Sequence, residues 1–262
     1  MEVKSSFPNF KNKHTKDSLI TPKDFLLYLK RRRALPKFKP PKGIIFCYSS
    51  TLLDYILKNH RVKKIKIHGI HSDIYLLKDT NYRIGIAKLA GIGAPVTATV
   101  MEEFIVLGVK KFLVIGDAGS LSKRLKTNKI IVCDKAIRDE GTSHHYLPPS
   151  KYAYATKKLI TKAERVLDKR GLEYEVGASW TIDAPYRETS SEVKKFQKEG
   201  VLTVEMEAAA VFAVAEYRKV AAGALFTISD YLGELEWKPK FHLSKKLLEK
   251  LFLAAVEVLL TS

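Results

Sequence analysis

The chain has 262 residues, with 46 Lys and Arg against 28 Asp and Glu, which gives a formal net charge of +18. Hydrophobic residues make up 46% of the sequence and aromatic residues 10%, enough to bury a sizeable core. This composition excludes a disordered, a collagen-like and a disulfide-scaffold protein, and it indicates a folded globular protein.

The sequence gives no sign of a membrane or secreted protein. No apolar run of the signal-peptide type follows the first residues, so we expect a cytoplasmic protein. Nowhere do about 18 consecutive apolar residues occur, so no membrane contact is expected. Cys47 and Cys133 both stand in short apolar runs, which predicts buried reduced thiols and neither a disulfide nor a metal site.

A basic extension, residues 1–42, precedes the main domain. The first 43 residues hold twelve Lys or Arg and three Asp or Glu, so half of the excess charge lies in a short part of the chain. The extension is expected to be solvated, with one short helix over 21–33. It could bind nucleic acid, but no aromatic platform accompanies the charge, so a surface arm or subunit contact is favoured. The Lys-rich composition also fits a thermophile.

From residue 43 onward, short β-branched apolar runs alternate with longer segments of helical period. Strands are predicted at 44–48, 64–77, 82–89, 111–116, 129–137, 173–181, 201–204 and 221–229. Helices are predicted at 50–59, 95–108, 151–170, 189–199, 206–217 and 243–260. The alternation predicts one α/β domain over 43–262, a three-layer α/β/α fold around a mostly parallel mixed sheet.

Four places at predicted strand ends carry residues suited to chemistry, and ligands of such sheets bind beyond the strand ends. They are the glycine loop 91–95 (GIGAP), the run 114–119 (VIGDAG), the acidic segment 205–207 (EME) and the Ser-Asp pair 229–230. Each alone has a plain structural explanation, such as a tight turn, a helix-dipole complement or a cap. The glycines at 93 and 116 would also let the backbone approach a ligand.

Together these places resemble the nucleoside phosphorylase family, which includes purine nucleoside phosphorylase, uridine phosphorylase and related nucleosidases. The resemblance rests on 91–121, 138–148 (RDEGTSHHYLP), 204–217 (VEMEAAAVFAVAEY) and 227–230 (TISD), in the family's order and spacing. It implies the fold predicted above and cleavage of the N-glycosidic bond of a purine or pyrimidine nucleoside.

The resemblance also implies roles for individual residues. Glu207 would hold the ribose hydroxyls, with Met206 packed against the sugar and Glu205 supporting both. Asp230 would protonate or hydrogen-bond a purine N7, and Ser229 would orient it. The residues implied for substrate binding besides these are Tyr186 and Arg187 at the base, and Gly93 and Gly116 in the loops.

The phosphate ligands usual in that family are missing. Where its phosphorylases have an Arg and a Ser or Thr, this chain has Val114 and Asp117, and an acid repels a phosphate dianion. An ungapped count from Gly93 puts His71 where a neighbouring subunit lends an Arg. The other residues that could hold phosphate are Ser49, Ser50, Thr51 and Arg138.

Phosphorolysis, the reaction that the family resemblance implies, is the preferred expectation, with phosphate as co-substrate. The first alternative is a nucleosidase in which Asp117 activates water as a general base. The second is a non-catalytic protein that binds nucleosides or nucleic acid. Retention of both Glu207 and Asp230 argues against this second alternative, because a binding module needs no proton donor at the base.

The loop 138–148 contains Asp139, Glu140, His144 and His145, residue types that could bind a metal. Adjacent histidines on one loop seldom both reach one ion, so a contact near the base or a subunit interface is expected instead. The resemblance implies no metal and no cofactor. It implies a small-molecule nucleoside as substrate and a homo-oligomer built from dimers, often a hexamer.

Overall fold

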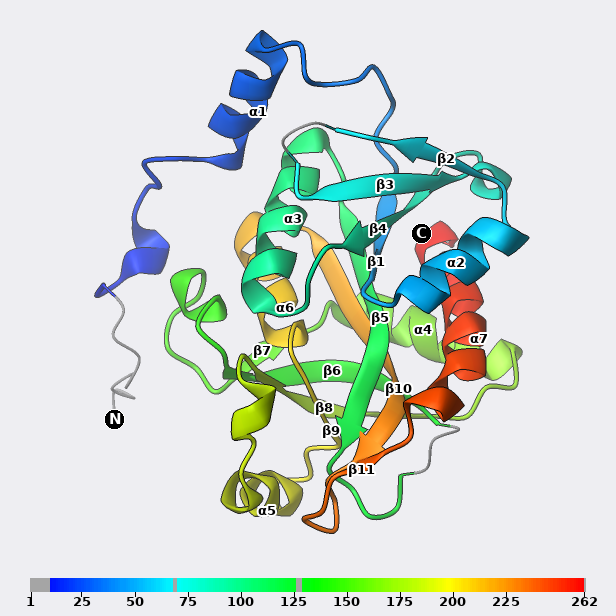
Figure 1. The fold of residues 1–262 in the computed structure, drawn as a ribbon. Helices are drawn as coiled ribbons and strands as arrows, with labels where there is room; N and C mark the ends of the chain where they lie inside the picture. Colours follow the sequence, from blue (N-terminus) through cyan, green and yellow to red (C-terminus); the bar gives the residue numbers. More distant parts are fainter. Residues whose placement is uncertain (1–9, 68–69, 126–128, 262) are drawn as a thin grey trace.

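The computed structural model describes residues 10–67, 70–125 and 129–261. Part of the predicted extension, residues 1–9, lies outside these ranges. The described extension forms an arm along the outside of the body and contains α1, Pro22–Arg31 (Figure 1). Thr21 and Asp24 form a capping box at its start, where Pro22 occupies the first helical position, so the helix expected at 21–33 is confirmed.

Five strands pair in a closed circle and form a small barrel. In circular order they are β5 (Lys111–Ser120), β10 (Ala221–Tyr231), β6 (Ile130–Asp139), β8 (Tyr174–Ile182) and β9 (Thr203–Glu205). The pairs β5–β10, β6–β8 and β8–β9 are parallel, while β10–β6 and β9–β5 are antiparallel. The sheet is therefore mixed, as expected, and the closure of the circle is what the structure adds.

Further strands extend the sheet from β5, β6 and β10. Outward from β5 the order is β1 (Gly43–Cys47), β4 (Ile84–Leu89), β3 (Ser72–Leu77) and β2 (Val62–Ile65). Two short strands, β7 (Tyr152–Tyr154) and β11 (Lys238–Pro239), pair with β6 and β10.

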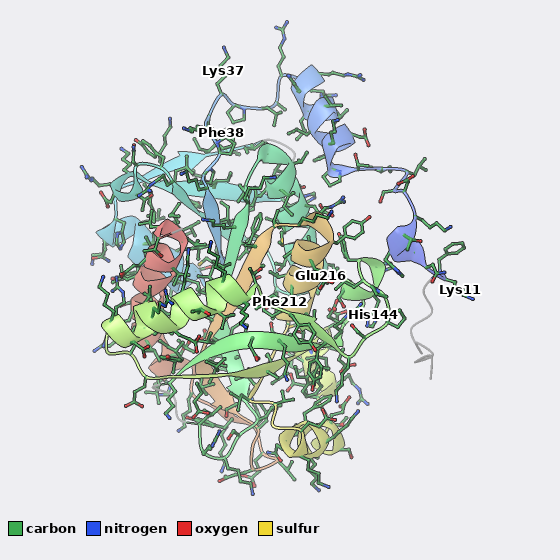
Figure 2. The ribbon with its side chains drawn as sticks, turned by 180° about the vertical axis from the view of Figure 1, so that it is seen from behind. Lys11, Lys37, Phe38, His144, Phe212 and Glu216 are labelled. Carbon is green, nitrogen blue, oxygen red and sulfur yellow. The ribbon has the colours of Figure 1, made fainter. Side chains whose placement is uncertain are left out.

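Helices cover the sheet on both faces, which gives the layered α/β architecture (Figure 1). On one face α3 (Ala94–Leu107) packs against α6 (Ala208–Arg218), and Phe212 of α6 lies inside this layer (Figure 2). The other face carries α2 (Ser50–Asn59), α4 (Lys157–Lys169) and α7 (Phe241–Leu260). The remaining helix, α5 (Ser190–Lys198), closes a separate core cluster around Trp180.

Three predictions of secondary structure were wrong in detail. The region predicted as a helix from 151 begins with β7, because Tyr152 to Tyr154 pair with β6, and α4 starts only at Lys157. The single strand predicted at 64–77 is two antiparallel strands, β2 and β3. β5 continues beyond 116 because its last residues pair with both β10 and β9.

The two cysteines are buried free thiols, as predicted. Burial raises the pKa of the Cys47 thiol to about 12, so it is unreactive at neutral pH. Among the residues that the structure describes, no helix is long and apolar enough to cross a membrane.

Candidate active site

The first part of the site is a pair of glutamates at the junction of β9 and α6. Glu205, the last residue of β9, is buried, and its carboxylate accepts three hydrogen bonds. They come from Thr181 Oγ1 and from the backbone N–H groups of Glu207 at 2.8 Å and Ala208 at 2.7 Å. Burial raises the pKa of Glu205, while the three donors stabilise its charged form. Glu205 thus fixes the first turn of α6.

Glu207 occupies the N-cap position of α6 and faces the glycine loop before α3. Its Oε1 accepts a hydrogen bond of 2.6 Å from the backbone N–H of Gly93. Desolvation and the charge of the neighbouring Glu205 raise the pKa of Glu207. Met206, between the glutamates, is half-buried. The structure therefore joins two of the predicted strand ends that lie 114 residues apart in sequence.

Gly93 can be tested as the support of Glu207. Its φ of 104° and ψ of 159° lie in a backbone region nearly closed to residues with a Cβ. Space is not limiting, because a Cβ would approach only Pro95 Cδ, at 3.9 Å. We expect Gly93→Ala to lower the free energy of unfolding by about 1–3 kcal/mol through backbone strain. It should also slow the nucleoside cleavage expected from the sequence, because the N–H moves away from Glu207.

Gly91 of the same loop provides the matched control. Its φ is not in the left-handed range, and an added Cβ would meet only Val96 Cγ2, at 3.8 Å. Gly91→Ala should therefore change the free energy of unfolding by less than about 0.5 kcal/mol. Urea unfolding and steady-state kinetics measure both variants. Equal behaviour of the two would contradict the role assigned to the Gly93 backbone.

Asp230 lies at a β-bulge near the end of β10. Ile228 stands opposite Ala118 of β5, and Asp230 already stands opposite Gly119, so Ser229 is the extra residue. The sequence placed Asp230 just after its strand, but pairing with β5 and β11 carries β10 through to residue 231. Bulges of this kind re-aim a side chain, and they are common beside active sites.

Both carboxylate oxygens of Asp230 accept hydrogen bonds. Ser229 Oγ donates to Oδ1 at 2.6 Å, and the indole N–H of Trp237 donates to Oδ2 at 2.9 Å. Gly119 leaves room for this carboxylate, because a Cβ there would lie 3.2 Å from Asp230 Oδ2 and 2.7 Å from Leu232 Cδ1. The sequence pattern gave no reason to single out Trp237, which reaches Asp230 only because β11 folds back on β10.

Asp117 lies inside β5, not at its end, and faces β10. Thr227 Oγ1 donates to Asp117 Oδ1 at 2.7 Å. The side chain is open to solvent but surrounded by protein on its other sides. Desolvation, with a smaller contribution from the charge of Asp230, raises the pKa of Asp117. The two aspartates therefore share one part of the site.

Tyr48, just after β1, connects the glutamates with β5. Its hydroxyl is within hydrogen-bond distance, 3.0 Å, of Thr97 Oγ1 on α3. Burial and the charges of Glu207 and Glu205 raise the pKa of Tyr48 well above its usual range. A Cβ at Gly116 of β5 would be 3.7 Å from the Tyr48 ring, an ordinary contact.

The residues that follow Tyr48 begin α2. Ser49 is the N-cap residue, and its Oγ accepts a hydrogen bond from the backbone N–H of Leu52 at 3.2 Å. Ser50 is the first helical residue and is exposed. Lys88, in register with Cys47 on the neighbouring β4, is half-buried, and its Nζ donates to the Leu89 carbonyl at 2.8 Å. A cation therefore lies at the strand ends beside this helix start.

His71 lies away from the glutamates of its own chain. Its Nδ1 is 2.6 Å from Glu103 Oε1, and its backbone N–H donates to Glu103 Oε2 at 3.1 Å. Glu103 stands nine residues beyond Ala94 on α3, about 14 Å along the helix axis from the glycine loop.

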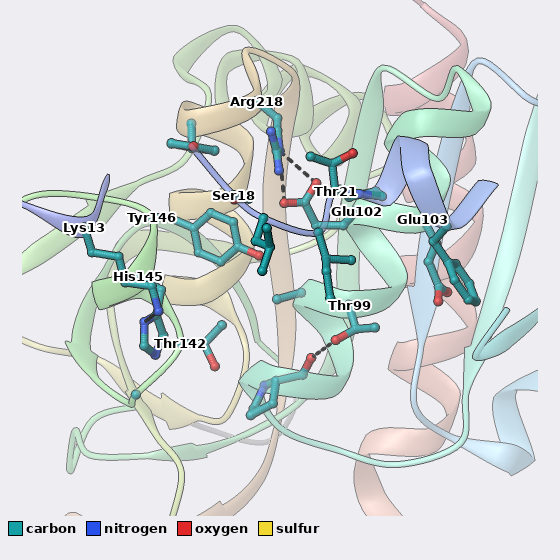
Figure 3. Close-up of a pocket in the computed structure, with 18 of the residues that line it drawn as sticks. Lys13, Ser18, Thr21, Thr99, Glu102, Glu103, Thr142, His145, Tyr146 and Arg218 are labelled. Atoms are coloured by element: carbon teal, nitrogen blue, oxygen red, sulfur yellow. Dashed lines mark hydrogen bonds and ion pairs between the residues drawn. The ribbon is translucent and has the colours of Figure 1, made fainter. Parts of the chain in front are cut away.

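His71 lines a cavity of about 980 Å³ between the arm and the body. In Figure 3, Arg218 faces Glu102 in this cavity and Lys13 of the arm reaches His145. Pro95, at the end of the glycine loop, and Asp183, which follows β8, lie in its wall.

The segment after β8 carries the residues expected at the base. Tyr186 and Arg187 belong to a short 3-10 helix, Pro185–Arg187, and both are exposed, Tyr186 fully. Glu188, the next residue, is half-buried. Burial, and then repulsion by Asp230, raises the pKa of Glu188 to about 7. Glu188 belongs to none of the sequence motifs above, although it directly follows two residues expected at the base.

Arg138 cannot be a phosphate ligand, contrary to one of the alternatives above. Its buried guanidinium donates to Ser143 Oγ, to Ser150 Oγ and to the carbonyls of Pro148, Ser143 and Leu147. All of its donor atoms are used to hold the loop 138–148. Burial lowers the pKa of Arg138, but the guanidinium remains charged at neutral pH.

The histidines of this loop are directed to different partners. His144 Nε2 lies 3.1 Å from the Arg138 carbonyl, and His145 Nδ1 lies 2.7 Å from Lys13 Nζ of the arm. His144 is visible at the edge of the loop in Figure 2. Within residues 10–67, 70–125 and 129–261, no cluster of three or more His, Cys, Asp or Glu has the arrangement of a metal site.

Comparison with known proteins gives related sequences that match part of the chain. A guanosine phosphorylase of Halorubrum lacusprofundi is 32% identical over 142 residues, which is 54% of this chain and 59% of the relative. A DeoD-type purine nucleoside phosphorylase of Bacillus cereus is 33% identical over 144 residues, 54% of this chain and 61% of the relative. The chain thus spans about six-tenths of the length of these curated relatives.

Solved structures extend the likeness to most of the fold. A uridine phosphorylase from Vibrio fischeri superposes with a TM-score of 0.70 over 85% of this chain and 92% of its own, at 21% identity. The family model described as the phosphorylase superfamily matches residues 52–257, which include both glutamates, the glycine loop and Asp230. The chain therefore belongs to the phosphorylase superfamily.

Proposed function

We propose that this protein cleaves the N-glycosidic bond of a nucleoside by phosphorolysis, releasing the free base and a pentose 1-phosphate. The observation that carries the proposal is the buried Glu207 carboxylate, held by the Gly93 N–H at the start of α6. Bond cleavage builds positive charge on the sugar and negative charge on the leaving base. A carboxylate at the sugar hydroxyls and an acidic group at the base stabilise both charges. The names of the curated relatives support the same reaction.

The sugar would lie against the β9–α6 junction. Glu207 would accept hydrogen bonds from the 2′ and 3′ hydroxyls, and Met206 would pack against the sugar ring. Glu205 keeps the first turn of α6 in place through the two backbone N–H groups that it accepts. This arrangement leaves the sugar close to carboxylates that strengthen their hold as positive charge develops.

The base would lie toward Asp230. Ser229 fixes one carboxylate oxygen, and Trp237 holds the other in the free protein. Tyr186, fully exposed in the free chain, would turn to stack on the base, with Arg187 at its edge. The purine N7 is the atom expected opposite Asp230.

Lys88 is our candidate for the cation that holds phosphate. It is half-buried beside the end of β1, and only its contact to the Leu89 carbonyl engages its ammonium group among the described residues. Ser49 and Ser50 at the start of α2 would add hydroxyl and backbone donors, and the helix dipole favours an anion there. Together they could replace the arginines that other family members use.

Hydrolysis is the second candidate function, and Asp117 is the observation that favours it. The raised pKa of Asp117, which has desolvation as its main cause, suits a general base that takes a proton from water. Its carboxylate would also repel a phosphate dianion placed directly beside it.

The test compares nucleoside cleavage with and without phosphate. We expect inosine, guanosine or adenosine to be cleaved only when phosphate is present, with pentose 1-phosphate as product. Lys88→Met should raise the KM for phosphate at least about tenfold, the effect of losing about 1.4 kcal/mol of charge-assisted binding. Coupled release of free base and sugar phosphate measures both quantities.

The control is Lys63→Met, because Lys63 is exposed on the distant strand β2. It should leave the KM for phosphate unchanged. Equal rates in phosphate-free buffer would refute phosphorolysis and support water as the nucleophile, in which case Asp117→Asn should abolish activity. If the wild type needs phosphate but Lys88→Met has an unchanged KM for phosphate, then Lys88 is not a phosphate ligand. The proposal of phosphorolysis would still stand.

The proposal includes a cytoplasmic homo-oligomer built from dimers, often a hexamer in this family, and no cofactor or metal. The arm, residues 1–42 in our division of the chain, would contact a second copy. Support comes from its exposed apolar side chains Phe10, Leu19 and Ile20, and from its basic residues such as Lys11 and Lys37 (Figure 2). His71, on the cavity beside the arm, would then face a neighbouring active site.

A further inference from the structure

Tyr48 is an aromatic residue of the site to which the proposed function gives no role. It directly follows β1, which pairs with β4 on one side and with β5 on the other, so both neighbouring strands fix its position. Its ring is half-buried and packs against the core cluster on the α3 and α6 face of the sheet. The ring lies 3.7 Å from the place that a Cβ of Gly116 would take. Its hydroxyl is directed toward α3.

This hydroxyl is the start of a short chain of hydrogen bonds that ends at Glu207. Tyr48 Oη lies 3.0 Å from Thr97 Oγ1, and Thr97 Oγ1 donates to the Gly93 carbonyl at 3.1 Å. The Gly93 N–H in turn donates to Glu207 Oε1 at 2.6 Å. A threonine hydroxyl has one proton and a carbonyl can only accept, so the hydroxyl of Tyr48 is the donor to Thr97.

Thr97 is more than a helix residue bonded to its own backbone. A threonine hydroxyl commonly donates to the carbonyl four residues earlier in a helix, and Thr99 does so to Pro95 at 2.9 Å. Thr99 is exposed, however, whereas Thr97 is fully buried and also accepts from the end of β1. Buried polar groups need partners, so the orientation of the Thr97 hydroxyl depends on Tyr48.

Gly93 is the part of this chain that needs support. A glycine has wide backbone freedom, so its φ of 104° and ψ of 159° must be held by hydrogen bonds at both of its ends. Its carbonyl accepts from Thr97 twice, from Oγ1 and from the backbone N–H at 3.2 Å. Burial, and then the charges of Glu207 and Glu205, raise the pKa of Tyr48 well above its usual range, so its hydroxyl stays a donor.

We propose that Tyr48 is a positioning residue that aligns the carboxyl group of Glu207 with the ribose hydroxyls of the substrate. This inference rests on the proposed function. Tyr48 acts through the glycine loop and not by contact with the substrate. Losing its hydroxyl therefore weakens the hold of Glu207 on the sugar in the transition state, and the loss depends on the hydroxyls of that sugar.

The test removes the Tyr48 hydroxyl in the full chain and compares two nucleosides. On guanosine with phosphate, we expect Tyr48→Phe to lower kcat about three- to tenfold, the range for one lost hydrogen bond, and to change KM less than about twofold. On 2′,3′-dideoxyguanosine the variant should match the wild type within about twofold, because the hydroxyls that Glu207 would hold are absent. The control is Tyr174→Phe, which alters a half-buried tyrosine at the opposite end of β8 and should match the wild type on both nucleosides.

Thr97 provides a second test of the same chain of hydrogen bonds. Thr97→Val removes the acceptor of Tyr48 and the donor to Gly93, so it should lower kcat on guanosine at least as much as Tyr48→Phe. Adding Tyr48→Phe to Thr97→Val should lower kcat no further, because both variants break one chain. Thr97→Ser keeps the hydroxyl and should restore kcat to within about twofold of the wild type. The matched control, Thr99→Val, should leave kcat unchanged.

Hydrogen exchange of the Gly93 amide, followed by NMR, gives a measurement that does not depend on activity. We expect exchange to be about three- to tenfold faster in Tyr48→Phe than in the wild type, because the backbone of Gly93 is held less firmly. Exchange in Tyr174→Phe should equal that of the wild type.

Four results would each overturn the role of Tyr48 while leaving the proposed function intact, because in each the wild type still cleaves guanosine. They are wild-type kcat in Tyr48→Phe, equal losses on guanosine and on its dideoxy analogue, additive effects of Tyr48→Phe and Thr97→Val, and unchanged exchange at Gly93. A wild type that cleaves no nucleoside would overturn both the proposed function and this inference.

Discussion

Replacing Glu207 by glutamine should lower kcat/KM for nucleoside cleavage by about 100- to 1,000-fold, the range for losing one group that stabilises the transition state. Glutamine keeps the size of the side chain and can still accept the hydrogen bond from the Gly93 N–H. It cannot become the carboxylate whose negative charge would stabilise a positively charged sugar. The loss should therefore appear mainly in kcat.

The stability of the same variant provides an independent check. A buried carboxyl with a raised pKa stabilises the fold while it is protonated, and this contribution is lost as pH rises through the folded-state pKa. Glutamine stays neutral at every pH. The Glu207→Gln protein should therefore melt no lower than the wild type above neutral pH, as scanning calorimetry can measure.

Two controls separate the proposed role from general damage. Glu216→Gln changes an exposed acid on the same helix and should leave kinetics and melting unchanged. A 2′,3′-dideoxynucleoside lacks the hydroxyls that Glu207 would hold, so the wild type and Glu207→Gln should cleave it at similar slow rates. A full 100-fold difference on that substrate would show that Glu207 does not act through the hydroxyls.

Asp230→Asn should lower kcat/KM on guanosine by about 100-fold or more, because the departing base loses the carboxyl group expected to protonate it or hydrogen-bond to it. A second effect follows from the neighbouring acid. Burial, and then the charge of Asp230, raise the pKa of Glu188, so Asp230→Asn should lower that pKa. Steady-state rates measure the first effect, and NMR titration of the Glu188 carboxyl from pH 5 to 9 measures the second.

The control for this variant is Asp54→Asn, an exposed acid on α2. It should reproduce the wild-type rate and the wild-type pKa of Glu188. An Asp230→Asn protein with wild-type rates would exclude Asp230 from the reaction. Reduced rates with an unchanged Glu188 pKa would keep Asp230 in the site but show that its charge does not act on Glu188.

Much of the fold follows from local patterns in the sequence. Helix α2 begins at Ser50 after a Ser49 cap and ends at Asn59, the bounds that its pattern predicts. The glutamate pair was also visible, because Glu205 and Glu207 follow an apolar strand and precede the alanine-rich helix α6. By contrast, the sequence pattern predicts helix where β7 lies. Its three residues are extended only because they pair with β6, and this pairing is not visible in the local sequence.

The residues of the candidate site also fall into two groups, those that a local motif indicates and those that only strand pairing brings together. Residues that lie within a motif, such as Gly93, Glu207 and Asp230, could be selected from sequence. Trp237 and the proposed phosphate ligand Lys88 could not, because the position of each depends on strand pairing: β11 folds onto β10, and β4 lies beside β1. Arg138 shows the converse. The sequence offers it as a possible phosphate ligand, but in the structure its guanidinium donates its hydrogen bonds to its own loop.

The sequence by itself determined the alternation of strands and helices, the superfamily resemblance and the place of half of the net charge of +18 in the first 43 residues. These properties depend on composition and on neighbours along the chain. Only the tertiary structure decided the closed circle of strands, the hydrogen-bond partners of the charged groups and the raised pKa of Glu188. Those depend on contacts between residues far apart in sequence, and burial and hydrogen-bond partners, which set the charge state of a carboxyl, exist only once such contacts have formed.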